Sequence, residues 1–457
     1  MKRADVLFHN TSNKCPSLLW LLGAFNITAW AICLSFLGLS LIVVDIASAQ
    51  SEIESLTLNE AVSEALRENR ELSALRISVQ QAEGKLRQAG ILPNPELEVS
   101  KSFDQPFHNE GEYTGSVGIK QPIPVSGRLS RAEEVARLEI EISKAEVENQ
   151  ERLLIGNAVG RFRELLVLEE KLRTNREIEE TLQKLIDVTE KRLKVAEVSP
   201  ADLNLEKLEL QRVILARSSL EILRDKARIA LNQLLGREPY AATAINGQPD
   251  LSLDSTTLQN ADQNALSRRP DRKAMVLKLS RAAAEVSLVK AERWEDWNVG
   301  VGYERERSVF DTSSIEPQVD GFMGLSLSVP LPLWNRHQGK LMETQAGEQR
   351  ARAELRALEL SITSEVQTLA IELKRLKQVL EQYSNETLQL SQSNVSLLRK
   401  SYEEGLVSIS AVLQAQQQLR ELRQSYADAI GEFLRAHTDF ETASGSINDL
   451  IDTQGGT

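Results

Sequence analysis

The sequence has few of the residues that build reactive or metal-binding sites. It contains two cysteines, four methionines and four histidines among 457 residues. Both cysteines, Cys15 and Cys33, lie in the first 49 residues, so the remainder has no disulfide, thiolate metal ligand or cysteine nucleophile. The histidines beyond that segment, His108, His337 and His437, are scattered among unlike elements. We therefore predict that the chain is not an enzyme and holds no cofactor or resident metal.

Aromatic residues are also scarce. They make up 5% of the chain, whereas charged residues make up 26%. This balance is typical of long, solvent-exposed helices and not of large globular cores. The net charge is −12, and no basic patch with interleaved aromatic residues is present, which argues against nucleic acid as a partner.

The first 49 residues are predicted to be a signal peptide. Lys2 and Arg3 provide a basic start, and residues 18–44 are almost wholly apolar. The small residues at 47–49 form a signal-peptidase site before Gln50. Because the apolar run is longer than a usual signal core, an uncleaved membrane anchor is the alternative.

Proline is missing from two long stretches, between Val125 and Ser199 and after Leu333. These stretches predict helical hairpins over 129–235 and 337–444, the first helix reaching about 100 Å at 1.5 Å per residue. In the second stretch, apolar positions alternate steps of three and four, which is the pattern of a coiled coil. The seam consists of Val366, Leu369, Leu373, Leu376, Leu380, Tyr383, Thr387, Leu390, Asn394 and Leu397.

The chain repeats its pattern after about 200 residues. Each half has a helix (61–90, 265–292), two strands, a proline-rich corner and a hairpin. We predict repeats over 50–236 and 259–445, a connector over 237–258 and a flexible tail over 446–457. The strand-to-helix corners contain Pro122, Pro124, Gly127 and Arg128 in the first repeat, and Pro330, Pro332 and Arg336 in the second.

Four alternating runs, 95–103, 113–121, 297–305 and 322–330, predict strands with one apolar and one small or polar face. Lys101 is an exception on the apolar face. Runs of about nine residues suit a lipid-facing barrel, but four strands cannot close one, so several chains must contribute. The polar, acidic connectors 104–112 and 306–320 are expected to face the outside. A soluble hairpin packed on a helix is the alternative.

Each hairpin ends in a short turn that is the predicted docking site for a partner. Gly405 suits the left-handed residue that ends a helix, while Ser199 and Ser408 suit the cap of the returning helix. Small and apolar residues there suit end-on docking, and an ordinary helix-turn-helix cap is the alternative. The predicted docking residues are Val198, Ser199, Pro200, Gly405, Leu406 and Ser408.

With both halves laid out, residues 56–445 resemble the TolC family of outer-membrane factors, and most closely its CzcC-like heavy-metal efflux branch. The resemblance is carried by segments 92–97, 121–128, 330–339 and 402–416. It implies a mainly α fold with a small transmembrane β part: a homotrimer with a twelve-stranded outer-membrane β-barrel continued by a helical periplasmic tunnel. The implied partners are a periplasmic adaptor (membrane fusion) protein, a proton-driven inner-membrane efflux pump and the outer-membrane lipid bilayer.

The resemblance implies a passive efflux channel, with heavy-metal cations as the expected cargo. The alternatives are a duct for drugs or secreted proteins, and a structural periplasmic coiled-coil protein.

The sequence departs from the family pattern at three positions: Ala196 stands where the first tip often has glycine, and Ala411 and Gln414 replace gating aspartates. A carboxylate ring at 411 and 414 is therefore not expected, and Asp202 is interpreted as a solvated helix-start carboxylate.

Overall fold

The computed structural model describes residues 55–103, 112–253, 258, 261–308, 318–383 and 385–449. The predicted signal peptide, residues 104–111 and 309–317 of the two strand connectors, and residues 450–457 of the predicted tail lie outside the described residues. Within the described part, no helix is both long and apolar enough to cross a membrane.

Two helices open each half of the described chain. They are α2 (Leu58–Glu68) with α3 (Arg70–Ala89), and α7 (Ala261–Arg268) with α8 (Pro270–Glu292). The single helices predicted over 61–90 and 265–292 are therefore wrong. Asn69 ends α2 and caps α3 by accepting from the Leu72 amide at 2.9 Å. The second break falls at Arg269, because the following proline has no N–H and favours the first helical position.

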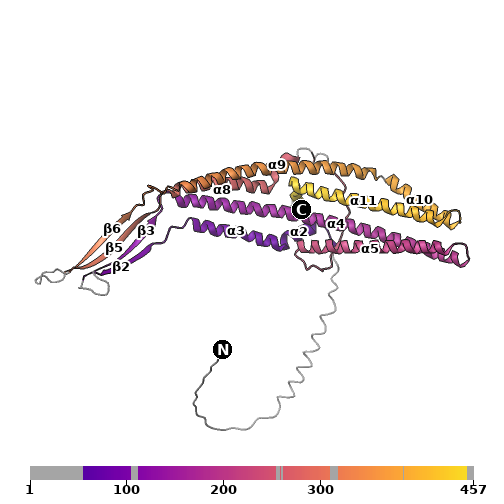
Figure 1. Cartoon of the computed structure of the whole chain (residues 1–457), viewed down its shortest axis with the longest axis horizontal. Coiled ribbons are helices and arrows are strands. Elements are labelled where there is room, and N and C mark those ends of the chain that lie inside the picture. Colours follow the sequence, from indigo (N-terminus) through magenta and orange to yellow (C-terminus); the bar gives the residue numbers. More distant parts are fainter. Residues whose placement is uncertain are drawn as a thin grey trace, which may run out of the picture. The chain divides into compact units, whose positions relative to one another are not determined.

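The four long strands form one antiparallel sheet in the order β2-β3-β5-β6 (Figure 1). Their bounds are β2 Glu96–Phe103, β3 Tyr113–Ile123, β5 Trp297–Ser308 and β6 Gln318–Ser328. Strand β6 ends before Val329 because Pro330 cannot donate to the ladder and restricts its predecessor. Strands β5 and β6 also extend into 306–320, so both ends of that predicted connector are strand.

The sheet has one largely apolar face that the described residues leave exposed. Rows of outward side chains run across all four strands, for example Leu97, Ile119, Val301 and Leu325 in register. Leu97 is 70% exposed and Leu325 is 89% exposed. The predicted alternation therefore holds in the structure.

The helices of the two hairpins extend away from the sheet, and in Figure 1 they lie alongside one another. They are α4 (Arg128–Lys194), α5 (Pro200–Leu234), α9 (Gln338–Gln382), α10 (Asn385–Glu403) and α11 (Ile409–Ser444). Helix α4 has 67 residues, which corresponds to about 100 Å. The mainly helical fold with a small β part is thus confirmed.

The predicted second rod is interrupted between α9 and α10. Tyr383 has a ψ of 55°, outside the helical range. The interruption shifts the buried stripe by one residue, so Val395 is 7% exposed whereas Leu390 and Leu397 are 69% and 63% exposed. The unbroken heptad seam predicted through Leu397 is therefore wrong beyond Tyr383.

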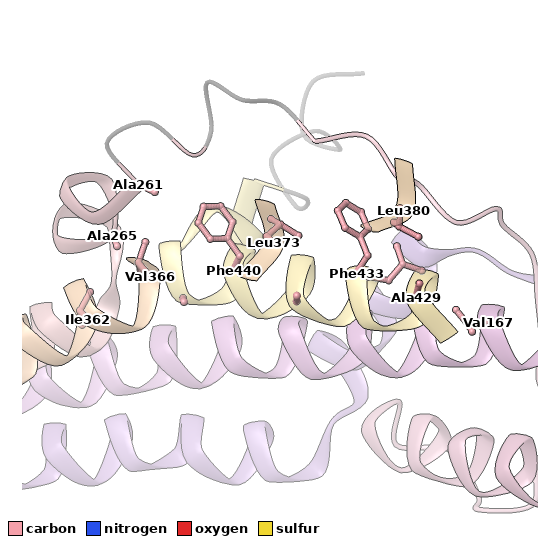
Figure 2. Close-up of a cluster of buried hydrophobic side chains, with 13 residues drawn as sticks. Val167, Ala261, Ala265, Ile362, Val366, Leu373, Leu380, Ala429, Phe433 and Phe440 are labelled. Atoms are coloured by element: carbon pink, nitrogen blue, oxygen red, sulfur yellow. The ribbon is translucent and has the colours of Figure 1, made fainter. Parts of the chain in front are cut away.

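The main core lies where α4, α7, α9 and α11 meet. Phe433 and Phe440 of α11 are fully buried and pack with Leu373 of α9 and Ala265 of α7 (Figure 2). A second cluster joins α2, α3, α4 and α5 around Phe162. Strand β1 (Ser55–Leu56) pairs in parallel with β4 (Ala244–Ile245) beside this cluster.

The end of the described chain is folded against the core. Residues Ser446–Asn448 form a 3₁₀ helix, and Ile447 is completely buried beside Val62 and Val159. The predicted flexible tail therefore does not begin at 446.

Candidate functional site

Both hairpins end in the same turn, in which an amide bonds back to a carbonyl five residues earlier. At the first tip the Glu197 amide donates to the Arg192 carbonyl at 3.1 Å, and at the second the Leu406 amide donates to the Ser401 carbonyl at 2.8 Å. This is the Schellman motif, which satisfies carbonyls at a helix end. The two tips therefore share one backbone design despite different sequences.

The motif needs a left-handed residue, and the two tips supply different ones. Gly405 has a φ of 75°, whereas Ala196 has a φ of 60°. Glycine adopts this conformation without a steric penalty, but alanine does not. The first tip therefore holds a strained residue where the second holds a relaxed one.

The returning helices begin differently at the two tips. Ser199 accepts from the Ala201 amide at 3.1 Å, and Asp202 accepts from the Ser199 amide at 3.1 Å. Asp202 is thus part of a capping box at the start of α5. Ser408 precedes α11 but has no side-chain bond to the helix backbone, and its hydroxyl pairs with that of Ser410 at 2.8 Å.

The structure places most of the predicted docking residues at the surface of the tips. Val198 is half-buried, unlike the other members of the predicted set. Val195 was missed by the sequence analysis, although it is 65% exposed and adjoins Ala196. The exposed members of the predicted set are Ser199, Pro200, Gly405, Leu406 and Ser408.

Arg192 of the first hairpin binds the second hairpin just behind the tips. Its Nη1 donates to the Tyr402 carbonyl at 2.6 Å, and its guanidinium lies 4.9 Å from the centre of the Tyr402 ring. Its Nε also donates to Glu197 at 3.1 Å. One side chain therefore joins the C-terminal ends of α4 and α10.

A buried chain of hydroxyl groups makes a second link between the hairpins. Thr189 donates to Glu206 Oε1 at 2.7 Å, and the Tyr402 hydroxyl lies 3.1 Å from the Thr189 hydroxyl. Since the Thr189 proton is given to Glu206, the Tyr402 hydroxyl donates to Thr189.

Glu206 is an ionisable group in an apolar seam. It is 0% exposed, and its Oε2 has no hydrogen-bond partner among the described residues. Burial raises the pKa of Glu206 to about 7, the Thr189 hydrogen bond lowers it in part, and the charge of Asp202 raises it further. Glu206 was not predicted from the sequence, although it lies three residues after Leu203, about one turn along the buried side of α5.

The first strand-to-helix corner is tied to the other repeat. Pro122 lies within β3 and Pro124 just beyond it, and Gly127 precedes α4 with a φ of 70°. Arg128 Nε donates to Asp296 Oδ1 at 2.7 Å, with a second contact between the guanidinium and the same carboxylate. Asp296 directly precedes β5, so this ion pair clamps the two repeats together.

Among the residues that the structure describes, Arg336 of the second corner forms no ion pair with the other repeat. His337 takes the place of the glycine, with a φ of 55°. Arg336 donates to the carbonyl of Pro332 at 3.2 Å, within its own corner, and Pro330 lies just after β6. Arg336 lies before the left-handed residue of its corner, whereas Arg128 follows its own and begins α4. The two arginines, which the sequence motifs align, therefore differ in both position and partner.

The described residues contain no group of three or more His, Cys, Asp or Glu side chains arranged to hold a metal ion. The expectation that the chain holds no resident metal stays a prediction.

Comparisons with known proteins agree with this geometry. The chain is 22% identical over 390 residues to the cobalt-zinc-cadmium resistance protein CzcC of Cupriavidus metallidurans, covering 85% of this chain and 90% of that protein. The fold matches solved CusC with a TM-score of 0.68 at 20% identity, covering 86% and 93% of the two chains. It matches VceC from Vibrio cholerae with a TM-score of 0.65 at 18% identity, covering 85% and 96%.

The family model for outer membrane efflux proteins matches residues 61–237 and 262–446, well over half of the chain. Both matched segments contain a strand pair and a long helical hairpin. This chain is a member of the outer membrane efflux protein family and belongs to the outer membrane.

Proposed function

We propose that three copies of this chain form the outer-membrane channel of a tripartite efflux system and conduct cargo passively to the exterior. The observation that carries the proposal is the four-stranded sheet with one largely apolar face whose aliphatic side chains are exposed. Such a face is stable in lipid, and a sheet in lipid must be closed. The chain's own four strands leave β2 and β6 paired on one side only.

Three copies would bring twelve strands into one barrel by pairing β2 of each chain with β6 of the next. The same arrangement would place the long helices side by side as a tunnel in the periplasm. The exposed side chains Leu215 and Ile222 of α5 and Leu390 and Leu397 of α10 supply apolar surface for contacts between copies. The family resemblance supports the number three.

The hairpin tips are the proposed contact with a periplasmic adaptor protein, which would connect the channel to a proton-driven pump in the inner membrane. The exposed Val195 and Leu406 side chains, on a backbone fixed by Schellman turns, provide small apolar contacts at the far end of the helices.

Substituting Leu406→Glu should abolish export while leaving oligomer and barrel intact, because a carboxylate in an apolar interface is costly. Ile77→Glu, on the exposed side of α3, is the matched control and should export normally. Normal export by Leu406→Glu would refute docking at this tip.

Heavy-metal cations are the proposed cargo, supported by the similarity to CzcC. Glu96, Glu98 and Glu304 lie on the sheet face opposite the apolar one, so carboxylates would line the barrel interior. This lining suits cations in general. We therefore propose that the inner-membrane pump, and not this channel, determines which cation is exported.

Growth of a deletion strain tests the proposal. The strain is exposed to zinc, cobalt, cadmium, nickel, copper and silver, and in parallel to hydrophobic antibiotics and detergents. Sensitivity confined to metals and reversed by the wild-type gene is the expected result. Sensitivity confined to organic toxins would reject the metal cargo and favour a drug duct, and unchanged growth throughout would contradict an efflux role.

A further inference from the structure

The strand-to-helix corner of the second repeat exposes three large apolar side chains close together. Leu331, Leu333 and Trp334 lie between β6 and α9, and all three are exposed, Trp334 by 86%. We call residues 331–334 the apolar loop. Exposed apolar side chains that gather in one place mark contact with a partner or with a membrane, so the apolar loop needs a cover from outside the chain.

The apolar loop satisfies much of its own backbone polarity. Its proline has no N–H that would need a partner, and three of its carbonyls accept hydrogen bonds from within the corner or from the start of α9. In a lipid layer such internal pairing is required, because no water is present to replace it. The bonds run from the Leu333 amide to Leu331 at 2.8 Å, from Arg336 Nε to Pro332 at 3.2 Å and from Gln338 Nε2 to Trp334 at 3.3 Å.

Every tryptophan after residue 49 lies at this end of the sheet. Trp294 lies between α8 and β5, Trp297 is the first residue of β5, and Trp334 belongs to the apolar loop. Exposed apolar side chains also stand at the remaining connections between sheet and helices, with Leu92 before β2 and Val125 after β3. Tryptophan is enriched at the boundary between a membrane and water, which places that boundary at the strand-to-helix junction.

The outward apolar run of the strands is shorter than the apolar band of a membrane barrel. On β5 this run extends from Trp297 to Tyr303, six residues later, and Arg305 takes the next outward position. Six residues cover about 20 Å along a strand, and a tilt of about 40° reduces this to roughly 16 Å, whereas the apolar band of a barrel is about 25 Å tall. Part of the band must therefore come from beyond the strands, and the apolar loop adjoins them at the helix end.

The corner of the first repeat is built differently. Val125 is followed by Ser126 and Gly127, so this corner has no run of large apolar side chains. Its arginine, Arg128, is bound to Asp296 of the other repeat. The first corner thus joins the two repeats, whereas the second corner presents apolar surface.

We propose that the apolar loop inserts into the inner leaflet of the outer membrane, at the boundary between headgroups and acyl chains, and extends the apolar band of the barrel toward the periplasm. The inference rests on the proposed function, because it requires the sheet to span the outer membrane with its helices in the periplasm. Three copies would place three such loops around the barrel and hold it at a fixed depth.

Fluorescence quenching by brominated lipid tests this proposal in the assembled protein. Trp294→Phe/Trp297→Phe leaves Trp334 as the only tryptophan of the cleaved chain, and Trp294→Phe/Trp334→Phe leaves Trp297. Each variant is reconstituted into phosphatidylcholine vesicles, with or without bromine on the acyl carbons near the headgroup. Emission from Trp334 and from Trp297 should each fall at least about twofold in brominated vesicles, because both rings are placed at the membrane boundary.

The matched control moves the only tryptophan away from the sheet. Tyr240 is 84% exposed and lies between α5 and β4, outside the sheet and its corners. Tyr240→Trp, combined with replacement of the three tryptophans by phenylalanine, should give the same emission in both kinds of vesicle. The wild-type protein, which needs no substitution to assemble, should lose about half or more of its emission in brominated vesicles.

The outcomes separate this inference from the proposed function. Quenching of Trp297 without quenching of Trp334 would overturn the inference and leave the barrel in place, since a neighbouring copy or water would then cover the apolar loop. Quenching of neither residue, or a wild-type protein that forms no trimer, would instead refute the proposed function.

Discussion

At the residue scale, the burial of Glu206 predicts that the stability of the packed tips depends on pH. We call the observed arrangement, in which Thr189 contacts both Glu206 and Tyr402, the closed tip, and its locally unfolded form the open tip. The pKa of Glu206 rises from 4.5 to about 7 in the closed tip, because burial disfavours the charged carboxylate. Below pH 4.5 the group is protonated whether the tip is closed or open. Between pH 4.5 and about 7 the open tip loses the proton first. The contribution of neutral Glu206 to the stability of the closed tip is therefore fully present below pH 4.5, and it is lost as the pH rises through about 7.

We predict that Glu206→Gln slows hydrogen exchange of the tip amides at pH 8 relative to wild type. At pH 4 the two proteins should exchange alike, because wild-type Glu206 is then mostly neutral in both the closed and the open tip. The measurement is exchange mass spectrometry of peptides covering 185–206, corrected for intrinsic rates. Glu180→Gln, an exposed position on α4, is the control and should match wild type at both pH values. A pH-independent effect of Glu206→Gln would contradict this role.

The strained first tip gives a second prediction. Ala196→Gly should stabilise the closed tip by about 0.5–1 kcal/mol, since relief of a left-handed alanine exceeds the added freedom of the open chain. Trypsin cleavage after Lys194 should slow by about two- to fivefold, because cleavage follows the population of the open tip. Gly405→Ala is the reciprocal change at the second tip and should lower its stability by about 1 kcal/mol. Faster cleavage of Ala196→Gly would show that the alanine is not strained.

At the scale of elements, the helices and strands were predicted well from the sequence, because their apolar residues recur at clear helical or alternating spacings. Helix α4 and the four alternating strands lie close to their expected positions. The breaks at Asn69 and Tyr383 were missed because neither residue excludes helix on its own. The break at Arg269 was missed as well, although the following Pro270 favours the start of a helix.

The site was predictable only where the backbone dictates the residue. Gly405, Ser199 and the corner glycine Gly127 were found because turns and caps require particular residue types. The link formed by Arg192, Thr189, Glu206 and Tyr402 was not found. Those residues lie on three helices, and their meeting depends on how the two hairpins pack.

The corners offer a prediction that separates the two repeats. Asp296→Asn should cost about 1–2 kcal/mol, because it removes the charge partner of a partly buried arginine. Arg336→Gln should be nearly neutral, because Arg336 contacts only its own corner. The temperature at which the assembled oligomer dissociates on gels reports the difference. Equal losses in both variants would contradict the clamp between repeats.

At the scale of the whole molecule, the proposed assembly accounts for the surfaces that the single chain leaves open. In Figure 1 the sheet lies at one end of the long helices and the two hairpin tips lie at the other. Within the described strands, β2 and β6 have one unpaired edge each, and an open edge in lipid leaves backbone groups without partners. In the proposed assembly, the exposed apolar face would contact lipid and the open edges of β2 and β6 would pair with neighbouring copies.

The pairing of β2 with β6 of the next copy is the central claim, and cysteine crosslinking tests it most directly. The sequence after residue 49 has no cysteine, so Val99→Cys combined in turn with Met323→Cys, Leu325→Cys or Leu327→Cys introduces the only thiols in the cleaved protein. All four positions face outward, and one pair should approach disulfide distance. We predict heat-resistant bands on non-reducing gels that end at a covalent trimer and disappear on reduction. Absence of crosslinks in every pair, or a ladder that continues beyond three copies, would contradict the closed trimeric barrel.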